Sequence, residues 1–354
     1  MSWQEIVGHQ RIIERIRQAV LRRRIAGSYL FAGPPGIGKF TIARKLAQTL
    51  LCMRRSDGSD EACGHCPSCR QVLAGSHPDL SVVCRSEERA TLSIDLFVGD
   101  HLHRNQEGLC QWIALKPFQS RYRVAIIDDA DDLSPESANV LLKTLEEPPP
   151  YAVIVLIATS LSRQLPTIRS RCQTIVFQPL ADDEVAEVLT RKGLVDDPRR
   201  RQELVRLAQG SVRTACELAD AEFLALRDEL LWELIRPDWK PAAVAELLIG
   251  YLDKATKDSI VKRRLFRHVV RAVSDVYRQM MRELAGLGPQ ADASLCRAAQ
   301  QALATGRFSW QTILDCLEAC LEADQAAQAH AHLPTLVDAW LDRLAEAAAI
   351  ICRL

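Results

Sequence analysis

A glycine-rich segment near the N-terminus has the residue types and the spacing of a phosphate-binding loop. The segment lies between an apolar run and a helical pattern, and it consists of Gly33, Pro34, Pro35, Gly36, Ile37, Gly38 and Lys39. Glycines allow backbone N–H groups to surround phosphate oxygens, while the lysine and the helix N-terminus supply positive charge. The pattern therefore predicts a site for the phosphates of ATP or ADP.

The residue after the loop lysine departs from the usual pattern. A Ser or Thr hydroxyl at this position binds magnesium in phosphate-binding loops, whereas this chain has Phe40. Thr41 is not a simple replacement, because one step along a helix turns the side chain by about 100°. We expect Phe40 and Thr41 to border the nucleotide, with weakened binding of Mg²⁺ and weakened hydrolysis.

Two carboxylates follow an apolar run in the right order for a nucleotide site. The run Val124–Ile127 leads directly into Asp128 and Asp129. In phosphate-loop ATPases the first acid at such a strand end holds magnesium, and the second position orients the attacking water. A displacement of about 1 Å at such a base can reduce the rate about a hundredfold. We therefore expect catalytic positions at Asp128 and Asp129. The Asp129 side chain is one methylene shorter than that of the glutamate that usually serves as this base.

Four cysteines have the spacing of a metal site. Cys52, Cys63, Cys66 and Cys69 form a Cys-x10-Cys-x2-Cys-x2-Cys pattern. Four thiolates without an open position are the ligand set of structural zinc. An iron–sulfur run of related spacing would need another cysteine, and Leu73 stands at that position. The sequence favours Zn²⁺, with an iron–sulfur cluster and unliganded thiols as the alternatives.

The pattern of apolar residues predicts an α/β part followed by an all-α part. The expected strands are Tyr29–Ala32, Leu80–Val83, Val124–Ile127, Val153–Ala158 and Thr174–Phe177. Helical segments separate these strands, which is typical of a parallel sheet covered on both faces. From about Ala181 only helical periodicity remains. We expect three domains, at residues 1–178, 179–240 and 241–354.

Composition excludes several classes of protein. The 354 residues include 48% hydrophobic residues, 45 basic residues and 45 acidic residues. A net charge of zero argues against a protein that coats nucleic acid through bulk positive charge. Neither a run of eighteen apolar residues nor the apolar region of a signal peptide is present. We expect a soluble cytoplasmic protein without membrane contact.

Taken together, these motifs resemble the clamp-loader subunits of bacterial DNA polymerase III, in the AAA+ superfamily. The resemblance extends over nearly the whole chain and includes the phosphate loop and the cysteine module. Further matching segments are Trp3–His9, His77–Leu80 and Asn139–Pro149, the last reading Asn-Val-Leu-Leu-Lys-Thr-Leu-Glu-Glu-Pro-Pro. The resemblance implies an AAA+ domain with a zinc module at about 52–69, a helical lid and a C-terminal helical collar.

The same resemblance implies roles for single residues. Val7 and Gly8 belong to the segment that lines the adenine pocket, and Thr159 matches the sensor 1 position, which reads the γ-phosphate. Arg213 matches sensor 2, which contacts the subunit's own nucleotide. Ser170-Arg171-Cys172 resembles the motif whose arginine reaches into a neighbour's ATP site, so that Arg171 would act in trans.

Within the family, the departures from the pattern favour one type of subunit. Phe40 and Asp129 weaken hydrolysis independently, while Arg171 is retained, as in a delta-prime stator. A gamma/tau-type ATPase subunit and a free-standing AAA+ ATPase are the alternatives. The implied partners are gamma/tau and delta subunits in a five-membered ring, the sliding clamp and primer–template DNA. The chain has no recognisable polymerase site.

Overall fold

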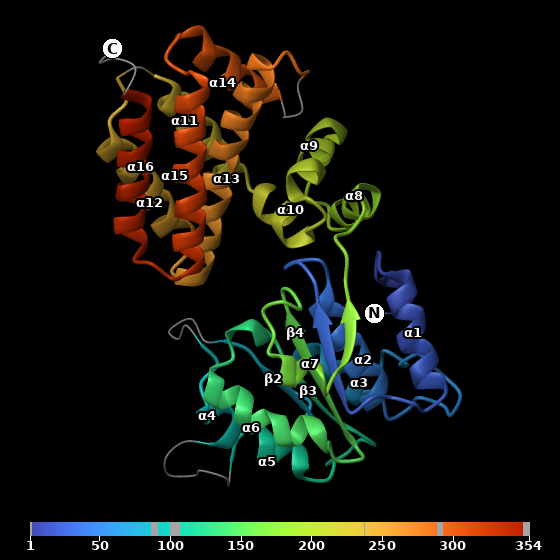
Figure 1. The fold of residues 1–354 in the computed structure, drawn as a ribbon. Helices are drawn as coiled ribbons and strands as arrows, with labels where there is room; N and C mark the ends of the chain where they lie inside the picture. The colour runs from blue at the N-terminus through green and yellow to red at the C-terminus, as the bar shows by residue number, and fades with distance from the viewer. Residues whose placement is uncertain (1, 86–90, 100–106, 237, 289–292, 350–354) are drawn as a thin grey trace. The chain divides into compact units, whose positions relative to one another are not determined.

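The computed structural model describes residues 2–85, 91–99, 107–236, 238–288 and 293–349. The chain forms two compact units, Met1–Cys216 and Glu217–Leu354. The first contains a sheet with helices on both faces, and the second contains helices (Figure 1). No helix within the described ranges is long and apolar enough to cross a membrane.

The first unit is built on a parallel sheet of five strands. The strands are β1 (Ser28–Ala32), β2 (Leu80–Val83), β3 (Arg123–Ile127), β4 (Ala152–Ala158) and β5 (Gln173–Val176). Their order in the sheet is β2-β3-β4-β1-β5, and every neighbouring pair is parallel. All five predicted strands are confirmed, with ends that differ by no more than one residue. The loop after β1 therefore lies next to the ends of β4 and β5.

Helices cover both faces of this sheet because alternate strand residues point to opposite sides. Val124 and Ile126 belong to one apolar core with α1 (Gln10–Leu21) and α2 (Lys39–Leu51). Ala125 and Ile127 belong to a second core on the opposite face. The second core includes residues of α4 (Asp95–Val98), α5 (Leu109–Ala114), α6 (Pro135–Glu146) and α7 (Pro166–Arg169). Strands buried on both faces explain the continuous apolar runs of the sequence.

Short helical segments complete the first unit. They are η1 (Trp3–Glu5), α3 (Pro67–Ala74), η2 (Ala130–Asp132), α8 (Asp182–Arg191), α9 (Pro198–Ala208) and the start of α10 (Val212–Leu218). Pro67 and Pro135 stand at the first turns of α3 and α6, where a missing N–H has no helical partner to lose.

The second unit is all helical, as the sequence predicts. Its helices are α11 (Ala221–Ile235), α12 (Pro241–Ala255), α13 (Ser259–Leu284), α14 (Ala293–Ala304), α15 (Trp310–Gln328) and α16 (Leu333–Ala349). The long helix α13 packs against α14 and α15, and α15 packs against α16.

The two compact units divide at one position in the chain. It lies between Cys216 and Glu217, and α11 belongs to the second unit. The physical reason is that α11 buries an apolar face, including Phe223 and Leu230, and packs against α12, α13 and α14. A separate lid domain at 179–240 and a collar at 241–354 stay predictions.

Candidate nucleotide site and metal centre

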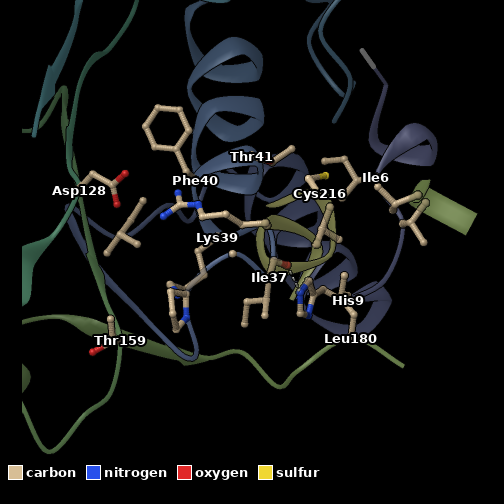
Figure 2. A pocket seen from close by; sticks show the side chains of 18 of the residues that line it. Ile6, His9, Ile37, Lys39, Phe40, Thr41, Asp128, Thr159, Leu180 and Cys216 are labelled. Carbon is tan, nitrogen blue, oxygen red and sulfur yellow. Dashed lines mark hydrogen bonds between the residues drawn. The ribbon is translucent and has the colours of Figure 1, made fainter. Parts of the chain in front are cut away.

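A pocket of about 600 Å³ lies at the carboxyl ends of β3 and β4, beside the phosphate-type loop. Residues predicted for the nucleotide site that line it are Val7, Gly36, Ile37, Gly38, Lys39, Phe40, Thr41, Asp128, Asp129, Thr159 and Arg213. Figure 2 shows several of these side chains converging around Lys39. Carboxyl ends of parallel strands are the usual ligand-binding edge of such sheets.

Close packing explains the glycine in the middle of the loop. Gly36 has a φ of 77°, and a Cβ at this position would lie 2.3 Å from Ser211 Oγ and 2.6 Å from Arg213 Cβ. The backbone N–H of Arg213 also donates a hydrogen bond to the Gly36 carbonyl at 3.3 Å. A side chain at Gly36 would therefore separate the loop from the segment that carries Arg213.

Lys39 is almost completely buried, and its surroundings shift the pKa of its ammonium group. Its ammonium group donates hydrogen bonds to the carbonyl oxygens of Gly33 and Pro34, within the loop itself. Burial lowers the pKa of Lys39 to about 8, while the charges of Asp128 and Asp131 oppose this shift. The ammonium group is thus positioned at the centre of the loop, where phosphate binding would require it.

The acidic edge of the pocket contains three carboxylates in place of the two predicted. Burial raises the pKa of Asp128, and the nearby charge of Asp129 adds to this effect. Asp129 has a left-handed backbone with φ 55°, and its N–H donates to Asp128 Oδ1 at 3.1 Å. Asp131 also lines the pocket and accepts a hydrogen bond from the backbone N–H of Thr159. Only the fold identifies Asp131, because acids are common in polar loops after strands.

Phe40 lies in the first turn of α2, where it lines the pocket and packs partly against the adjacent apolar core. In Figure 2 its ring lies on the same side of Lys39 as Asp128. An aromatic side chain at this place offers no oxygen ligand to a cation beside Asp128. The weakened Mg²⁺ binding expected from the sequence stays a prediction.

The opposite side of the pocket is more apolar. Ile6, Val7, Leu180 and Val188 line it. His9 lies here as well, with Nε2 2.8 Å from the Ile37 carbonyl oxygen, and burial lowers the pKa of its imidazole. Sequence reasoning missed the role of His9 in the wall. The backbone of His9 has the left-handed conformation, which directs its side chain but can be recognised only in the structure.

Three predicted residues lie behind the pocket rather than in its lining. These are Gly8, Gly33 and Pro34. Gly8 approaches Leu180 and Gly33 approaches Phe177 so closely that a Cβ would come within 2.5 Å of them. The Pro34 carbonyl accepts a hydrogen bond from Lys39. The two glycines allow the backbone to pack closely against neighbouring segments, and the Pro34 carbonyl helps to position Lys39.

The four clustered cysteines converge as the spacing predicts. Their sulfur atoms all lie within 4.8 Å of one another. The Sγ atoms of Cys52 and Cys66 are 4.0 Å apart, as are those of Cys63 and Cys69. A tetrahedral zinc with Zn–S bonds of about 2.3 Å requires S–S separations of about 3.8 Å. The residues therefore fit a closed four-thiolate zinc site.

Neighbouring elements orient these thiols. Cys52 follows the last residue of α2, and Cys66 is the N-cap of α3, which also contains Cys69. Backbone N–H groups of Cys63 and Cys69 donate to the sulfurs of Cys52 and Cys66, each at 3.4 Å. Such hydrogen bonds stabilise thiolates and orient them toward a metal.

Comparisons with known proteins show similarity to subunits of DNA polymerase III. The family model described as "DNA polymerase III, delta subunit" matches residues 8–181. The tau/gamma subunit of DNA polymerase III from Haemophilus influenzae is 32% identical over 62% of this chain and 30% of its own length. The delta' subunit from Bacillus subtilis is 33% identical over 53% of this chain and 54% of its own length. The delta' subunit from Pseudomonas aeruginosa is 33% identical over 56% and 57%, respectively.

These similarities support a clamp-loader subunit related to the tau/gamma and delta' subunits of DNA polymerase III. It spans between about a third and a little over half of the length of these curated relatives. Both tau/gamma and delta' subunits are among them, so the comparisons do not distinguish between these two types of subunit.

One residue to which the resemblance assigns a role lies outside the lining of the candidate nucleotide pocket. Arg171 is absent from the pocket lining. Its guanidinium group donates from Nε and Nη2 to Glu146 Oε2 at 3.2 Å, and from Nη1 to the Thr167 carbonyl at 3.1 Å. The segment Asn139–Pro149, which resembles the family most closely, thus contributes through Glu146 the carboxylate that holds Arg171.

Proposed function

We propose that this chain is a delta-prime-type stator subunit of a clamp loader. In this proposal its pocket binds ATP or ADP and hydrolyses it poorly. One observation carries the proposal: Phe40 occupies the first turn of α2 inside the pocket, where a hydroxyl would bind Mg²⁺. Asp129 adds to the effect as a shortened base. The partners would be gamma/tau and delta subunits, the sliding clamp and primed DNA enclosed by the assembled ring.

Arg171 would act on a neighbour's nucleotide and not on its own. Support comes from its place outside the pocket and from the partly exposed ion pair with Glu146. Such a pair is weak in water and can open when a stronger anion approaches. A neighbour's phosphate offers that anion, and an arginine stabilises charge on a transferring phosphoryl group.

Zinc would have a structural role here. Cys52, Cys63, Cys66 and Cys69 would hold it with no position left for a substrate. The metal would supply folding energy to a loop that has little apolar core of its own. The four cysteine side chains and one small apolar residue, Ala62, make up the local cluster.

A gamma/tau-type ATPase subunit is the second candidate. Lys39, Asp128 and Arg213 all line the pocket, which supports nucleotide binding and leaves part of the hydrolytic machinery present. Steady-state ATP turnover of the isolated chain separates the two candidates. The stator proposal expects turnover close to the background, whereas brisk turnover abolished by Lys39→Ala would refute it.

The trans role of Arg171 requires the assembled complex. Gamma/tau subunits, delta and this chain would be mixed, and DNA-stimulated ATP hydrolysis would be measured with Arg171→Ala and Arg171→Lys. An arginine finger contributes on the order of 10³-fold or more at its site, so both variants should silence the one active site that this subunit faces. Lysine retains charge without the planar fork. Normal hydrolysis by the Ala complex would exclude the proposed role.

A further inference from the structure

The loop that carries the cysteines is joined to the N-terminal segment of the chain. The indole Nε1 of Trp3 donates a hydrogen bond to the Asp60 carbonyl at 2.9 Å. The backbone N–H of Trp3 donates to Glu61 Oε2 at 3.3 Å. Trp3 is only 2% exposed, so its indole is held on one side by apolar packing and on the other by the cysteine loop.

The carboxylate of Glu61 also reaches the helix that follows the phosphate-type loop. Its second oxygen pairs with the ammonium group of Lys45 in α2, and the Lys45 side chain is completely buried. The same ammonium group lies 5.7 Å from the centre of the Trp3 ring. A buried charge requires a partner to offset its lost hydration. Glu61 therefore connects α2 to the N-terminal segment at a position two residues before Cys63.

A further contact fixes the opposite end of the module. The side-chain amide of Gln48, buried in α2, donates to the Cys69 carbonyl at 3.4 Å. In α1, Arg17 Nε pairs with Asp60 Oδ2 at 2.5 Å. The cysteine module thus contacts three separate elements of the AAA+ domain: η1, α1 and α2.

The elements held by Glu61 lead directly into the nucleotide pocket. Three residues that follow shortly after Trp3, namely Glu5, Ile6 and Val7, line this pocket. The carbonyl of Glu5 accepts a hydrogen bond at 2.9 Å from Arg191, another residue of the lining. Helix α2 begins with Lys39 and Phe40 at the phosphate end. Both ends of the pocket are therefore attached to residues that also hold the cysteine module.

We propose that the metal-loaded cysteine module positions the nucleotide pocket through Glu61 and Trp3, so that zinc occupancy and nucleotide affinity are coupled. Loss of the metal would free the backbone around Cys63 and let Glu61 leave Lys45 and Trp3. The wall formed by residues 5–7 would then lose its support. Coupling between sites is reciprocal, so bound nucleotide should raise the affinity for zinc by the same factor. This inference rests on the proposed nucleotide and zinc sites.

The test combines zinc removal with substitutions that remove the contacts made by Glu61 and Trp3. ADP affinity of the full chain would be measured before and after chelation, with zinc content determined on the same samples. The variants are Glu61→Gln, which removes the charge at nearly constant size, and Trp3→Phe, which removes the indole donor together with part of the buried ring. Glu136→Gln, an exposed change in α6, is the matched control. Hydrogen exchange of residues 2–9 and of β3 would be followed in parallel.

We expect zinc removal to weaken ADP binding about tenfold, a typical coupling between sites. The zinc-loaded Glu61→Gln protein should bind ADP about as weakly as the zinc-free unsubstituted chain. Removing zinc from this variant should weaken ADP binding little further, since coupled changes are not additive. Exchange in residues 2–9 should rise while β3 stays protected, which separates local loosening from unfolding. The Glu136→Gln control should follow the unsubstituted chain.

Equal ADP affinity and equal exchange of residues 2–9 with and without zinc would overturn the inference. So would independent, multiplying effects of zinc removal and Glu61→Gln. If the zinc-loaded chain binds no ADP, the proposed nucleotide function fails. The exchange of residues 2–9 in Glu61→Gln and Trp3→Phe then still decides whether the module positions this segment.

Discussion

The carboxylate of Asp131 accepts a hydrogen bond from the backbone N–H of Thr159, with a distance of 2.6 Å between Oδ2 and the nitrogen. Its other oxygen accepts from Gln164 Nε2 at 2.8 Å. Asp131 lies in η2 after β3, and Thr159 directly follows β4. One carboxylate therefore fixes the relative position of two strand ends that border the candidate nucleotide pocket.

Removing this carboxylate should destabilise the first unit. Asp131→Ala leaves the Thr159 N–H without its partner, and a lost partner of a part-buried donor costs about 1–3 kcal/mol. Asp131→Asn retains one oxygen for Thr159 and should cost less. Urea denaturation of both variants would measure the difference. Equal losses would mean that the charge, and not the hydrogen bond, stabilises this edge.

Restoring a hydroxyl at position 40 should restore a response to Mg²⁺. Phe40→Thr places an oxygen in the first turn of α2, beside Asp128, and should strengthen ATP binding in the presence of Mg²⁺ about tenfold, or about 1.4 kcal/mol. Phe40→Val is the matched control, because it has nearly the shape of Thr without the hydroxyl. ATP titrations with and without Mg²⁺ would provide the measurement. The same Mg²⁺ response in both variants would argue against Phe40 as the cause.

Nucleotide affinity should fall as the pH rises through about 8. Burial lowers the pKa of Lys39 to about 8, so the free protein loses the positive charge of the loop above this pH. Bound phosphate favours the charged form, and the affinity for ADP should therefore be level well below pH 8 and decrease above it, by at most about tenfold per pH unit. Calorimetric titrations over this range would test the sign.

Lys39→Met supplies the control for this pH dependence. It cannot titrate, so it should bind ADP more weakly and show no decrease centred near pH 8. A decrease of the same size in Lys39→Met would assign the titration to another group.

Asp79 should be among the residues most important for stability in the first unit. Its carboxylate is fully buried and accepts backbone hydrogen bonds from Phe118, Gln119 and Ser120 at 2.5, 2.9 and 2.9 Å. Asp79→Ala leaves three donors without their acceptor and should lower the unfolding free energy by about 3 kcal/mol or more. Asp183→Asn, an exposed change at the start of α8, should stay within about 0.5 kcal/mol. A small loss for Asp79→Ala would show that water replaces the carboxylate.

The elements of the sheet could be predicted because their signals are local. Runs such as Val153–Ala158 are apolar throughout, and the strand β4 is buried along its whole length. The unit boundary could not be predicted, because a proline-flanked segment after α11 resembles a hinge. Which unit α11 joins depends on the helices it packs against, and two of these, α13 and α14, lie more than 20 residues further along the chain.

The candidate site shows the same contrast. Gly36, Lys39 and the four cysteines could be identified because their chemistry depends on fixed short spacing. Asp131 and His9 could not, because their places in the lining come from a turn after β3 and from a left-handed residue before α1. The ion pair between buried Lys45 and the partly exposed Glu61 also cannot be recognised in the sequence, where both residues look like ordinary surface charges.

The sequence by itself determined the kind of site, since backbone N–H groups around a phosphate and thiolates around a metal require only neighbours a few residues apart. Tertiary structure alone decided how those sites are related. It placed Arg171 outside its own pocket beside Glu146, joined Asp131 to Thr159, and connected the cysteine loop to both ends of the nucleotide pocket. The reason is physical: a buried charge or an orphaned donor takes the partner that the folded chain brings near, at any separation in sequence.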